Sequence, residues 1–232
     1  MKIYVVGSSK NKFMPLDDIR EKFFIDKQHK GDNIDYLNPW YCELTGLYYL
    51  WKHVDDDIVG LEHYRRYFVN DRHKLGLLSK EQIAKILSTH DIIVDNMHYR
   101  NKTFSIWDTR ISPKREFDFR TALIVVKEFY PDIYPFVKNY LKERNVVEGN
   151  MFICRKELID EYCSFIFDVL DIYRKGLEHF NVKLNPRICG YIAEYFFGGW
   201  LVYKNLRKYE NKRLYIDKKT GKKSIYLEKE AD

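Results

Sequence analysis

The segment with the clearest capacity for chemistry is residues 60–68, GLEHYRRYF, which follows two apolar residues. We predict one continuous strand over 58–68, apolar at its start and polar at its end. Side chains alternate along a strand, so His63 and Arg65 would share one face and Arg66 would lie on the other. Arginine forms bidentate hydrogen bonds with phosphate, and histidine stabilises departing negative charge, which suits this strand end to a diphosphate. A strand end that carries surface ion pairs is the alternative.

Two carboxylates are candidates for a catalytic base. Glu194 lies in an aromatic-rich helix expected over residues 187–205, close in sequence to Arg187. There it would accept the proton of an attacking hydroxyl during an inverting displacement, although a buried pair of Glu194 with Arg187 would explain the same residues. Asp95, at the end of a short apolar strand, is the second candidate base. If the protein uses a divalent Mg²⁺ or Mn²⁺ ion, Asp95 is its expected ligand, and no cofactor is otherwise indicated.

The remaining candidate binding residues lie at the ends of expected elements. Gly7 and Ser8 end the first apolar strand, and the carboxyl ends of strands are where α/β sheets bind nucleotides. Asn150 precedes another strand and would either bind ligand hydroxyls or cap a turn. Glu43 and Arg187 are the candidates for contacts with the molecule that carries the attacking hydroxyl. Glu43 also lies in the first turn of a helix, where it would complement the helix dipole.

Periodic patterns predict the elements that would position these residues. Residues 2–7 read as a buried strand, and apolar residues recur at helical spacing over 43–52. Ser79 begins a helix that runs to about residue 88, with Gln82 completing a capping box. Further strands are expected over 91–96 and 149–154, helices over 117–130, 132–144, from 155 to about 175 and over 187–205, a hairpin between 213–217 and 223–228, and a lid or acceptor loop over 97–116. Strands and helices in this order predict an α/β fold.

Composition limits the class of protein. The chain has 232 residues, of which 45% are hydrophobic, enough for one sizeable core. The sequence contains no G-x-G-x-x-G, G-x-x-x-x-G-K-S/T, H-E-x-x-H or G-x-S-x-G motif, so the usual signatures of dinucleotide, P-loop, zinc protease and hydrolase chemistry are missing. The four cysteines form no C-x-x-C pair. With no signal-peptide pattern and no apolar run of membrane-spanning length, we expect a cytoplasmic protein, peripheral at the inner face of the cell membrane.

Positive charge is concentrated near the C-terminus. The formal net charge is +6, and residues 204–232 contain ten Lys or Arg against five Asp or Glu. We therefore expect a main domain over 1–203 and a basic appendage over 204–232. Such an appendage favours an anionic membrane surface as partner rather than nucleic acid bound along the body. A solvated tail is the alternative.

Four motifs in order carry a resemblance to a known family. They are residues 41–48 (YCELTGLY), 59–68 (VGLEHYRRYF), 149–153 (GNMFI) and 190–194 (GYIAE). Together they resemble a bacterial glycosyltransferase family that was long catalogued as a domain of unknown function and is found in capsular and exopolysaccharide gene clusters. The resemblance covers about residues 1–203.

The resemblance implies a compact GT-A-like fold in a single domain. It also implies transfer of a sugar, galactofuranose in some members, from a nucleotide-sugar donor to a growing polysaccharide. We expect a uridine-linked donor and a lipid-linked oligosaccharide acceptor. Ordinary GT-A enzymes hold a metal on an Asp-x-Asp motif where this chain has His63-Tyr64-Arg65, which implies that cationic side chains replace the metal. The competing hypothesis is a non-enzymatic protein that binds nucleotides or polyanions.

Overall fold

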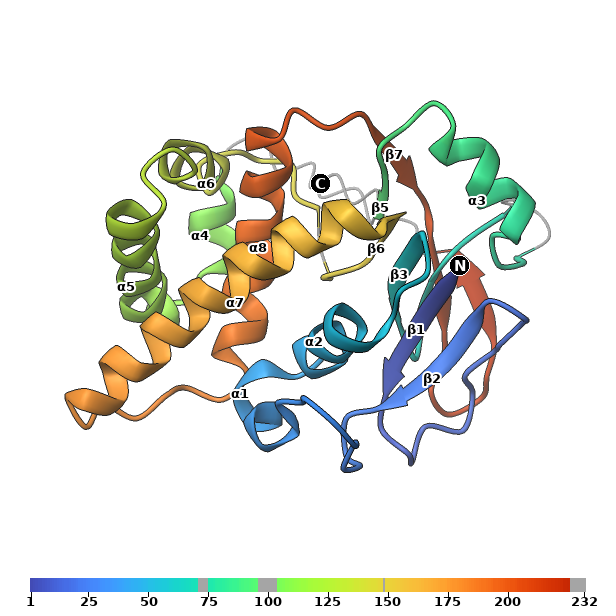
Figure 1. Cartoon of the computed structure of the whole chain (residues 1–232), viewed down its shortest axis with the longest axis horizontal. Coiled ribbons are helices and arrows are strands. Elements are labelled where there is room, and N and C mark those ends of the chain that lie inside the picture. Colours follow the sequence, from blue (N-terminus) through green and yellow to red (C-terminus); the bar gives the residue numbers. More distant parts are fainter. Residues whose placement is uncertain (71–74, 96–103, 148, 226–232) are drawn as a thin grey trace.

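A mixed β-sheet occupies the centre of the computed structural model, which describes residues 1–70, 75–95, 104–147 and 149–225 (Figure 1). Its main path runs β2-β1-β3-β6-β5-β7. In this path β6 is antiparallel to β3 and β5, while the other pairs are parallel. The strands are β1 (Lys2–Gly7), β2 (Arg20–Phe24), β3 (Ile58–His63), β5 (Ile92–Asp95), β6 (Phe152–Arg155) and β7 (Lys208–Asn211).

Helices cover both faces of this sheet, which confirms the predicted α/β class. The large group of helices lies on one face, and α3 lies on the other (Figure 1). The predicted Ser79 cap of α3 is confirmed, with the capping box completed by Gln82. The helices are η1 (Asp35–Leu37), α1 (Asn38–Tyr41), α2 (Leu44–His53), α3 (Lys80–Leu87), α4 (Ile106–Arg110), α5 (Pro113–Phe129), α6 (Tyr134–Tyr140), α7 (Lys156–His179) and α8 (Ile188–Tyr203).

The strand predicted over 58–68 is broken in two. β3 ends at His63, and after the two-residue turn Tyr64-Arg65 the chain returns as β4 (Arg66–Phe68), antiparallel to β3. The cause is the buried carboxylate of Glu62, which accepts a hydrogen bond from the Phe68 backbone N–H at 3.0 Å and so draws the chain back. The prediction that His63 and Arg65 share one face of a continuous strand is therefore wrong, because Arg65 lies in the turn after β3.

The C-terminal segment also differs from the expected appendage. β7 pairs with β5, and β8 (Arg213–Ile216) pairs with β4 and with β9 (Lys223–Ile225). Residues 208–216 are therefore part of the same sheet as the N-terminal strands. The expected terminal hairpin is confirmed as β8 and β9 within the described residues, and the basic side chains at 218–223 lie at its turn.

Part of the loop predicted over 97–116 is helical. Ser105 caps α4 in a capping box with Asp108, and Ser112 and Pro113 begin α5. These start signals were present in the sequence, but the helix α4 they begin is only five residues long and has no clear apolar period. Residues 97–103 of the predicted loop lie outside the described residues. Within the described part of the chain, no helix is long and apolar enough to cross a membrane.

Two glycines allow α6 to pack closely against α8. A Cβ atom added at Gly198 would lie 2.1 Å from the ring of Tyr140, and one added at Gly199 would lie 2.5 Å from the Val137 Cα atom. Contacts this short would force α6 or α8 to move. Gly176 of α7 provides a contrast, because an added Cβ atom there meets no atom within 4 Å.

We therefore predict that Gly198→Ala lowers the free energy of unfolding by about 1–3 kcal/mol or more, the usual effect of overpacking a core. Gly176→Ala is the matched control. It should raise the free energy of unfolding by up to about 1 kcal/mol, because alanine loses less backbone entropy than glycine at an exposed position inside a helix. Urea unfolding followed by circular dichroism measures both changes. Equal stabilities of the two variants would contradict the close packing of α6 on α8.

Candidate active site

A cavity of about 450 Å³ opens at the carboxyl ends of β1 and β3, and we call it the arginine cavity. The register pairs Val6 with His63, so both strands end at the same edge of the sheet. Seven of the ten site residues predicted from the sequence line this cavity. The lining residues are Val6, Gly7, Ser8, Asn11, Ile25, Asn38, Pro39, Cys42, Glu43, His63, Tyr64, Arg65, Arg66 and Arg187.

Gly7 lets two segments meet at the wall of the cavity. A Cβ atom added at Gly7 would lie 2.7 Å from both Asn11 Oδ1 and Tyr64 Cβ, so a side chain at this position would push the loop after β1 away from the turn after β3. Asn11 Oδ1 accepts a hydrogen bond from the Ser8 backbone N–H at 2.6 Å, which fixes the loop. Sequence reasoning missed Asn11, because its position in an irregular segment gave no periodic signal.

Asp26, which follows β2, ties this loop to the sheet. It accepts hydrogen bonds from the Ser9 backbone N–H at 2.7 Å and from the Ser8 and Ser9 hydroxyls at 2.8 Å each. The hydrogen bond from the Ser9 backbone is the largest cause that lowers the pKa of Asp26 to about 2. The loop at the predicted donor residues Gly7 and Ser8 is thus held by a carboxylate that stays charged at neutral pH.

Three arginines reach the cavity from separate parts of the chain. Arg65 occupies the turn between β3 and β4, where its Nη1 atom lies 3.5 Å from the Tyr215 hydroxyl. Arg66 begins β4, and Arg187 precedes α8 with its backbone N–H donating to the Pro39 carbonyl at 2.9 Å. The sequence predicted all three as binding residues, and the fold brings them to one cavity. Glu43 is the one carboxylate among the lining residues, so the cavity is net positive.

His63 faces the cavity in its neutral form. Burial is the largest cause that lowers its pKa to about 4, and the charges of Arg66 and Arg213 act in the same direction. The Glu43 carboxylate and a hydrogen bond with the Gly149 backbone oppose this shift. His63 therefore offers hydrogen-bonding groups at neutral pH, and the cationic character of the cavity comes from its arginines.

Three of the six described non-glycine residues with a positive φ lie in the lining of the cavity or contact it. Cys42, Asn150 and Arg187 adopt φ values of 51°, 43° and 62°, in the left-handed region that residues other than glycine rarely occupy. Gly149 also has a positive φ of 94°. Strained residues persist where the surrounding structure holds them, and they are frequent at binding sites. The strain at these segments therefore supports a functional role for the cavity they surround.

Asn150 links the strained loop to Glu43. Its Nδ2 atom donates to Glu43 Oε1 at 2.8 Å and to the Gly190 carbonyl at 3.1 Å. Among the described residues, Asn150 Oδ1 and His63 Nε2 are buried atoms without a hydrogen-bond partner. Buried polar atoms in proteins are nearly always hydrogen-bonded, so unsatisfied atoms beside a cavity point to a polar ligand.

The two predicted catalytic carboxylates lie outside the lining of the arginine cavity. Glu194 Oε1 accepts a hydrogen bond from the Gly149 backbone N–H at 2.8 Å. Asp95 is buried and forms an ion pair with Arg213. Each carboxylate therefore contacts a residue that also interacts with His63, Gly149 in the case of Glu194 and Arg213 in the case of Asp95.

A metal ion is the one cofactor that the sequence analysis considered. The described residues contain no group of three or more His, Cys, Asp or Glu side chains that could hold one. Asp95, the expected ligand, pairs with Arg213. Its role in binding Mg²⁺ or Mn²⁺ stays a prediction.

Fold and cavity together define an α/β protein with a positively charged binding site at the carboxyl edge of its sheet. The chain aligns with the apo structure of the bifunctional glycosyltransferase WbbM with a TM-score of 0.77 and 22% sequence identity, over 93% of this chain. It spans 45% of the WbbM chain. The fold is therefore a glycosyltransferase fold.

A family model described as a domain of unknown function (DUF4422) matches residues 2–205, and the chain belongs to this family. No curated protein matches the chain. The family match agrees with the resemblance drawn from the four sequence motifs at the level of the family and its fold.

The low pKa of His63 predicts a pH-dependent stability. The unfolded value is about 6.5 and the folded value about 4. The unfolded state therefore binds more protons between these pH values, so stability falls as the pH drops through this window, by up to about 3 kcal/mol. His63→Gln should remove this part of the acid sensitivity in urea unfolding experiments, whereas the exposed His179→Gln should retain it. Parallel pH profiles for wild type and His63→Gln would contradict a buried neutral His63.

Proposed function

We propose that the chain is a glycosyltransferase that binds a nucleotide-sugar donor in the arginine cavity. The observation that carries this proposal is the meeting of Arg65, Arg66 and Arg187 at the carboxyl ends of β1 and β3, within a glycosyltransferase fold. Arginine pairs with phosphate through charge-assisted, bidentate hydrogen bonds. Three arginines and one carboxylate leave the cavity with a net positive charge, which favours a diphosphate over a neutral ligand.

The arginines also suit the departure of a nucleotide diphosphate. As the bond between the anomeric carbon and the diphosphate oxygen breaks, negative charge develops on that oxygen, and preorganised cationic donors stabilise it. Neutral His63 would contribute a hydrogen bond without adding charge. A uridine-linked hexose, with galactofuranose as one candidate, is the donor proposed from the family resemblance. A growing capsular polysaccharide or exopolysaccharide on a lipid carrier is the proposed acceptor.

Glu43 is the carboxylate best placed to accept the acceptor's proton. In an inverting transfer the acceptor oxygen bonds to the anomeric carbon, the diphosphate leaves with the bonding electrons, and a base takes the hydroxyl proton. Glu43 lines the cavity and is oriented by Asn150, while Glu194 binds the Gly149 backbone. We therefore propose Glu43 as the base, in place of the earlier expectation for Glu194, and propose that Glu194 positions the loop.

Arg65→Ala should weaken binding of uridine diphosphate by about 1.5–3 kcal/mol, the usual contribution of a charged hydrogen bond. This corresponds to about 10- to 150-fold in the dissociation constant. Isothermal titration calorimetry measures the change, with Arg120→Ala on the exposed face of α5 as the control. Unchanged affinity in a folded Arg65→Ala protein would contradict the proposed donor site. A thermal shift with heparin equal to that with uridine diphosphate would favour the polyanion-binding hypothesis.

Turnover measurements can decide whether Glu43 or Glu194 is the catalytic base. Glu43→Gln should reduce turnover by about 10²–10⁴-fold, the range for loss of a general base, while nucleotide affinity is retained. Glu194→Gln should retain most activity, because a glutamine oxygen can still accept the hydrogen bond from Gly149. Turnover measured with a uridine-diphosphate sugar in the presence of acceptor separates these outcomes. A severe loss in Glu194→Gln with an active Glu43→Gln would instead assign the base to Glu194.

The anionic membrane surface is proposed as a partner because lysine side chains line a depression that shares Arg65 with the arginine cavity. Lys10, Lys12 and Lys218 line a small depression beside Arg65, together with Phe13, which is 38% exposed. Basic residues near an anionic bilayer each contribute about 1 kcal/mol. A lipid-linked acceptor would then meet the donor at the membrane surface.

We predict that replacing Lys218, Lys219, Lys222 and Lys223 with glutamine reduces binding to vesicles containing anionic lipid by at least about tenfold at low salt. This change leaves β7 and β8 in place, whereas truncation after residue 205 would remove both strands from the sheet. The matched control neutralises the exposed lysines at positions 80, 85, 127 and 183. Equal vesicle sedimentation of both variants would contradict a specific membrane-facing surface.

A further inference from the structure

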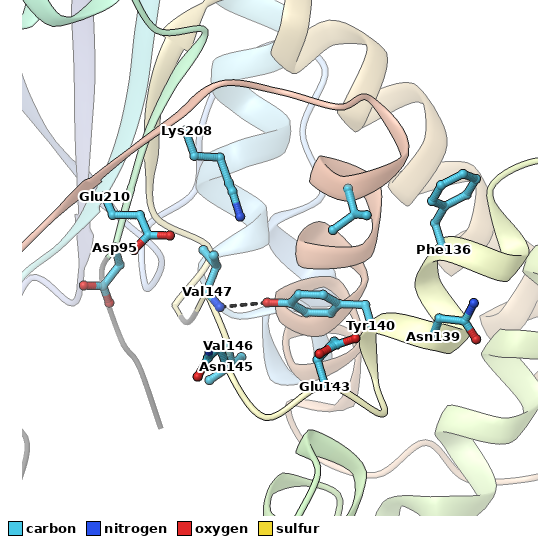
Figure 2. A pocket seen from close by; sticks show the side chains of 11 residues that line it. Asp95, Phe136, Asn139, Tyr140, Glu143, Asn145, Val146, Val147, Lys208 and Glu210 are labelled. Carbon is cyan, nitrogen blue, oxygen red and sulfur yellow. Dashed lines mark hydrogen bonds between the residues drawn. The ribbon is translucent and has the colours of Figure 1, made fainter. Parts of the chain in front are cut away.

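A second cavity, of about 330 Å³, lies beside the carboxyl ends of β5 and β7, and we call it the acidic cavity. Figure 2 shows Phe136, Asn139 and Tyr140 of α6 on one side and Lys208 and Glu210 of β7 on the other. The residues that line it are Asp95, Phe136, Asn139, Tyr140, Glu143, Asn145, Val146, Val147, Val202, Lys208 and Glu210.

The lining combines aromatic and apolar surface with groups that bind hydroxyls. Phe136 and Tyr140 supply rings, and Val146, Val147 and Val202 supply apolar surface. The amides and carboxylates of the lining can donate to or accept from several hydroxyl groups at once. A saccharide has the matching properties, with apolar C–H faces and a rim of hydroxyls.

The charges of the two cavities differ in sign. Three carboxylates line the acidic cavity with one lysine, Lys208. Asp95 is paired with Arg213, and the other two, Glu143 and Glu210, still outnumber Lys208. Three arginines and one carboxylate line the arginine cavity. A nucleotide diphosphate is therefore attracted to the arginine cavity and disfavoured in the acidic cavity, which suits a neutral ligand better.

The two cavities lie on the same edge of the sheet. Phe152 of β6 pairs with Leu61 of β3 and with Val94 of β5, so the chain that enters β6 passes between the ends of these two strands. Since neighbouring strands are about 4.8 Å apart, β3 and β5 lie about 10 Å from each other across β6.

One segment borders both cavities. Val146 and Val147 line the acidic cavity, and the Val147 backbone N–H donates to the Tyr140 hydroxyl oxygen at 2.8 Å (Figure 2). A few residues further on, Asn150 donates to Glu43 in the arginine cavity. A molecule held in the acidic cavity therefore lies next to the wall that positions the proposed base.

We propose that the acidic cavity binds the saccharide acceptor, an inference that rests on the proposed glycosyltransferase function. The acceptor would lie with its rings against Phe136 and its hydroxyls toward Glu210 and the amides of Asn139 and Asn145. Its reactive end would extend past Val147 and Asn150 toward Glu43. The acidic cavity thus selects the neutral acceptor, and the arginine cavity selects the charged donor.

The test measures saccharide and nucleotide binding separately on the full chain. Saturation-transfer NMR detects binding of methyl glycosides of galactose, glucose, mannose and rhamnose at millimolar concentration, with uridine diphosphate present. The double variant Phe136→Ala/Glu210→Gln should weaken binding of the responding glycoside by about tenfold or more, the effect of losing a packed ring and a charged hydrogen bond. The matched control is Phe129→Ala/Glu128→Gln, which changes an exposed ring and an exposed carboxylate at the end of α5.

Loss of the glycoside signal in the cavity variant, with the signal retained in the control, supports the proposal. An unchanged signal in the cavity variant would overturn it, as would a signal lost only in Arg65→Ala. Absence of any glycoside signal from the wild-type protein would also overturn it. Calorimetry with uridine diphosphate reports on the donor site independently, so a failure of the proposed function appears as lost nucleotide binding in the wild type.

Discussion

The buried ion pair between Arg20 and Glu62 fixes the place where the sheet turns back on itself. Arg20 Nε donates to Glu62 Oε2 at 2.7 Å, and neither side chain is exposed to solvent. The same carboxylate accepts from the Phe68 backbone, while Arg20 Nη1 donates to the Leu78 carbonyl at 3.0 Å. Removal of one partner would leave an uncompensated buried charge, which typically costs about 3–5 kcal/mol. Because this pair holds β4 against β3, it places the intervening turn, with Arg65, at the edge of the sheet.

Two cavities of opposite charge lie along that edge of the sheet. The cavity at β1 and β3 carries arginines, and the cavity at β5 and β7 carries carboxylates. Between them lies a strained segment, in which Gly149 binds Glu194 and Asn150 binds Glu43. Asp95 forms an ion pair with Arg213, and burial, followed by the charges of Arg66 and Arg213, lowers the pKa of His63. Of the two predicted catalytic carboxylates, Asp95 lines the acidic cavity, and Glu194 contacts the strained segment through Gly149.

Local patterns in the sequence predicted much of this architecture. The pattern of apolar residues at 2–7 predicted β1, and the capping box of Ser79 and Gln82 predicted the start of α3. Residue types also singled out three arginines and Glu43, which the fold brings to one cavity, while their roles in binding stay predictions. The sequence could not reveal that Glu62 pairs with Arg20, 42 residues away, and so the turn at Tyr64-Arg65 was missed. β7 was missed for a similar reason, because its strand KYEN has no apolar alternation and depends on pairing with β5. Long-range partners decided both cases, as tertiary context commonly overrides local propensity.

A crystal structure of the full chain with uridine diphosphate tests the central claim most directly, since the claim is that the arginine cavity holds the donor. The account predicts the diphosphate between the ends of β1 and β3, with its oxygens in hydrogen-bond contact with at least two of Arg65, Arg66 and Arg187. A structure of the Arg65→Ala protein under the same conditions serves as the control and should show a loss of nucleotide occupancy. A diphosphate bound in the acidic cavity, or bound at the arginine cavity without contact to these arginines, would contradict the account.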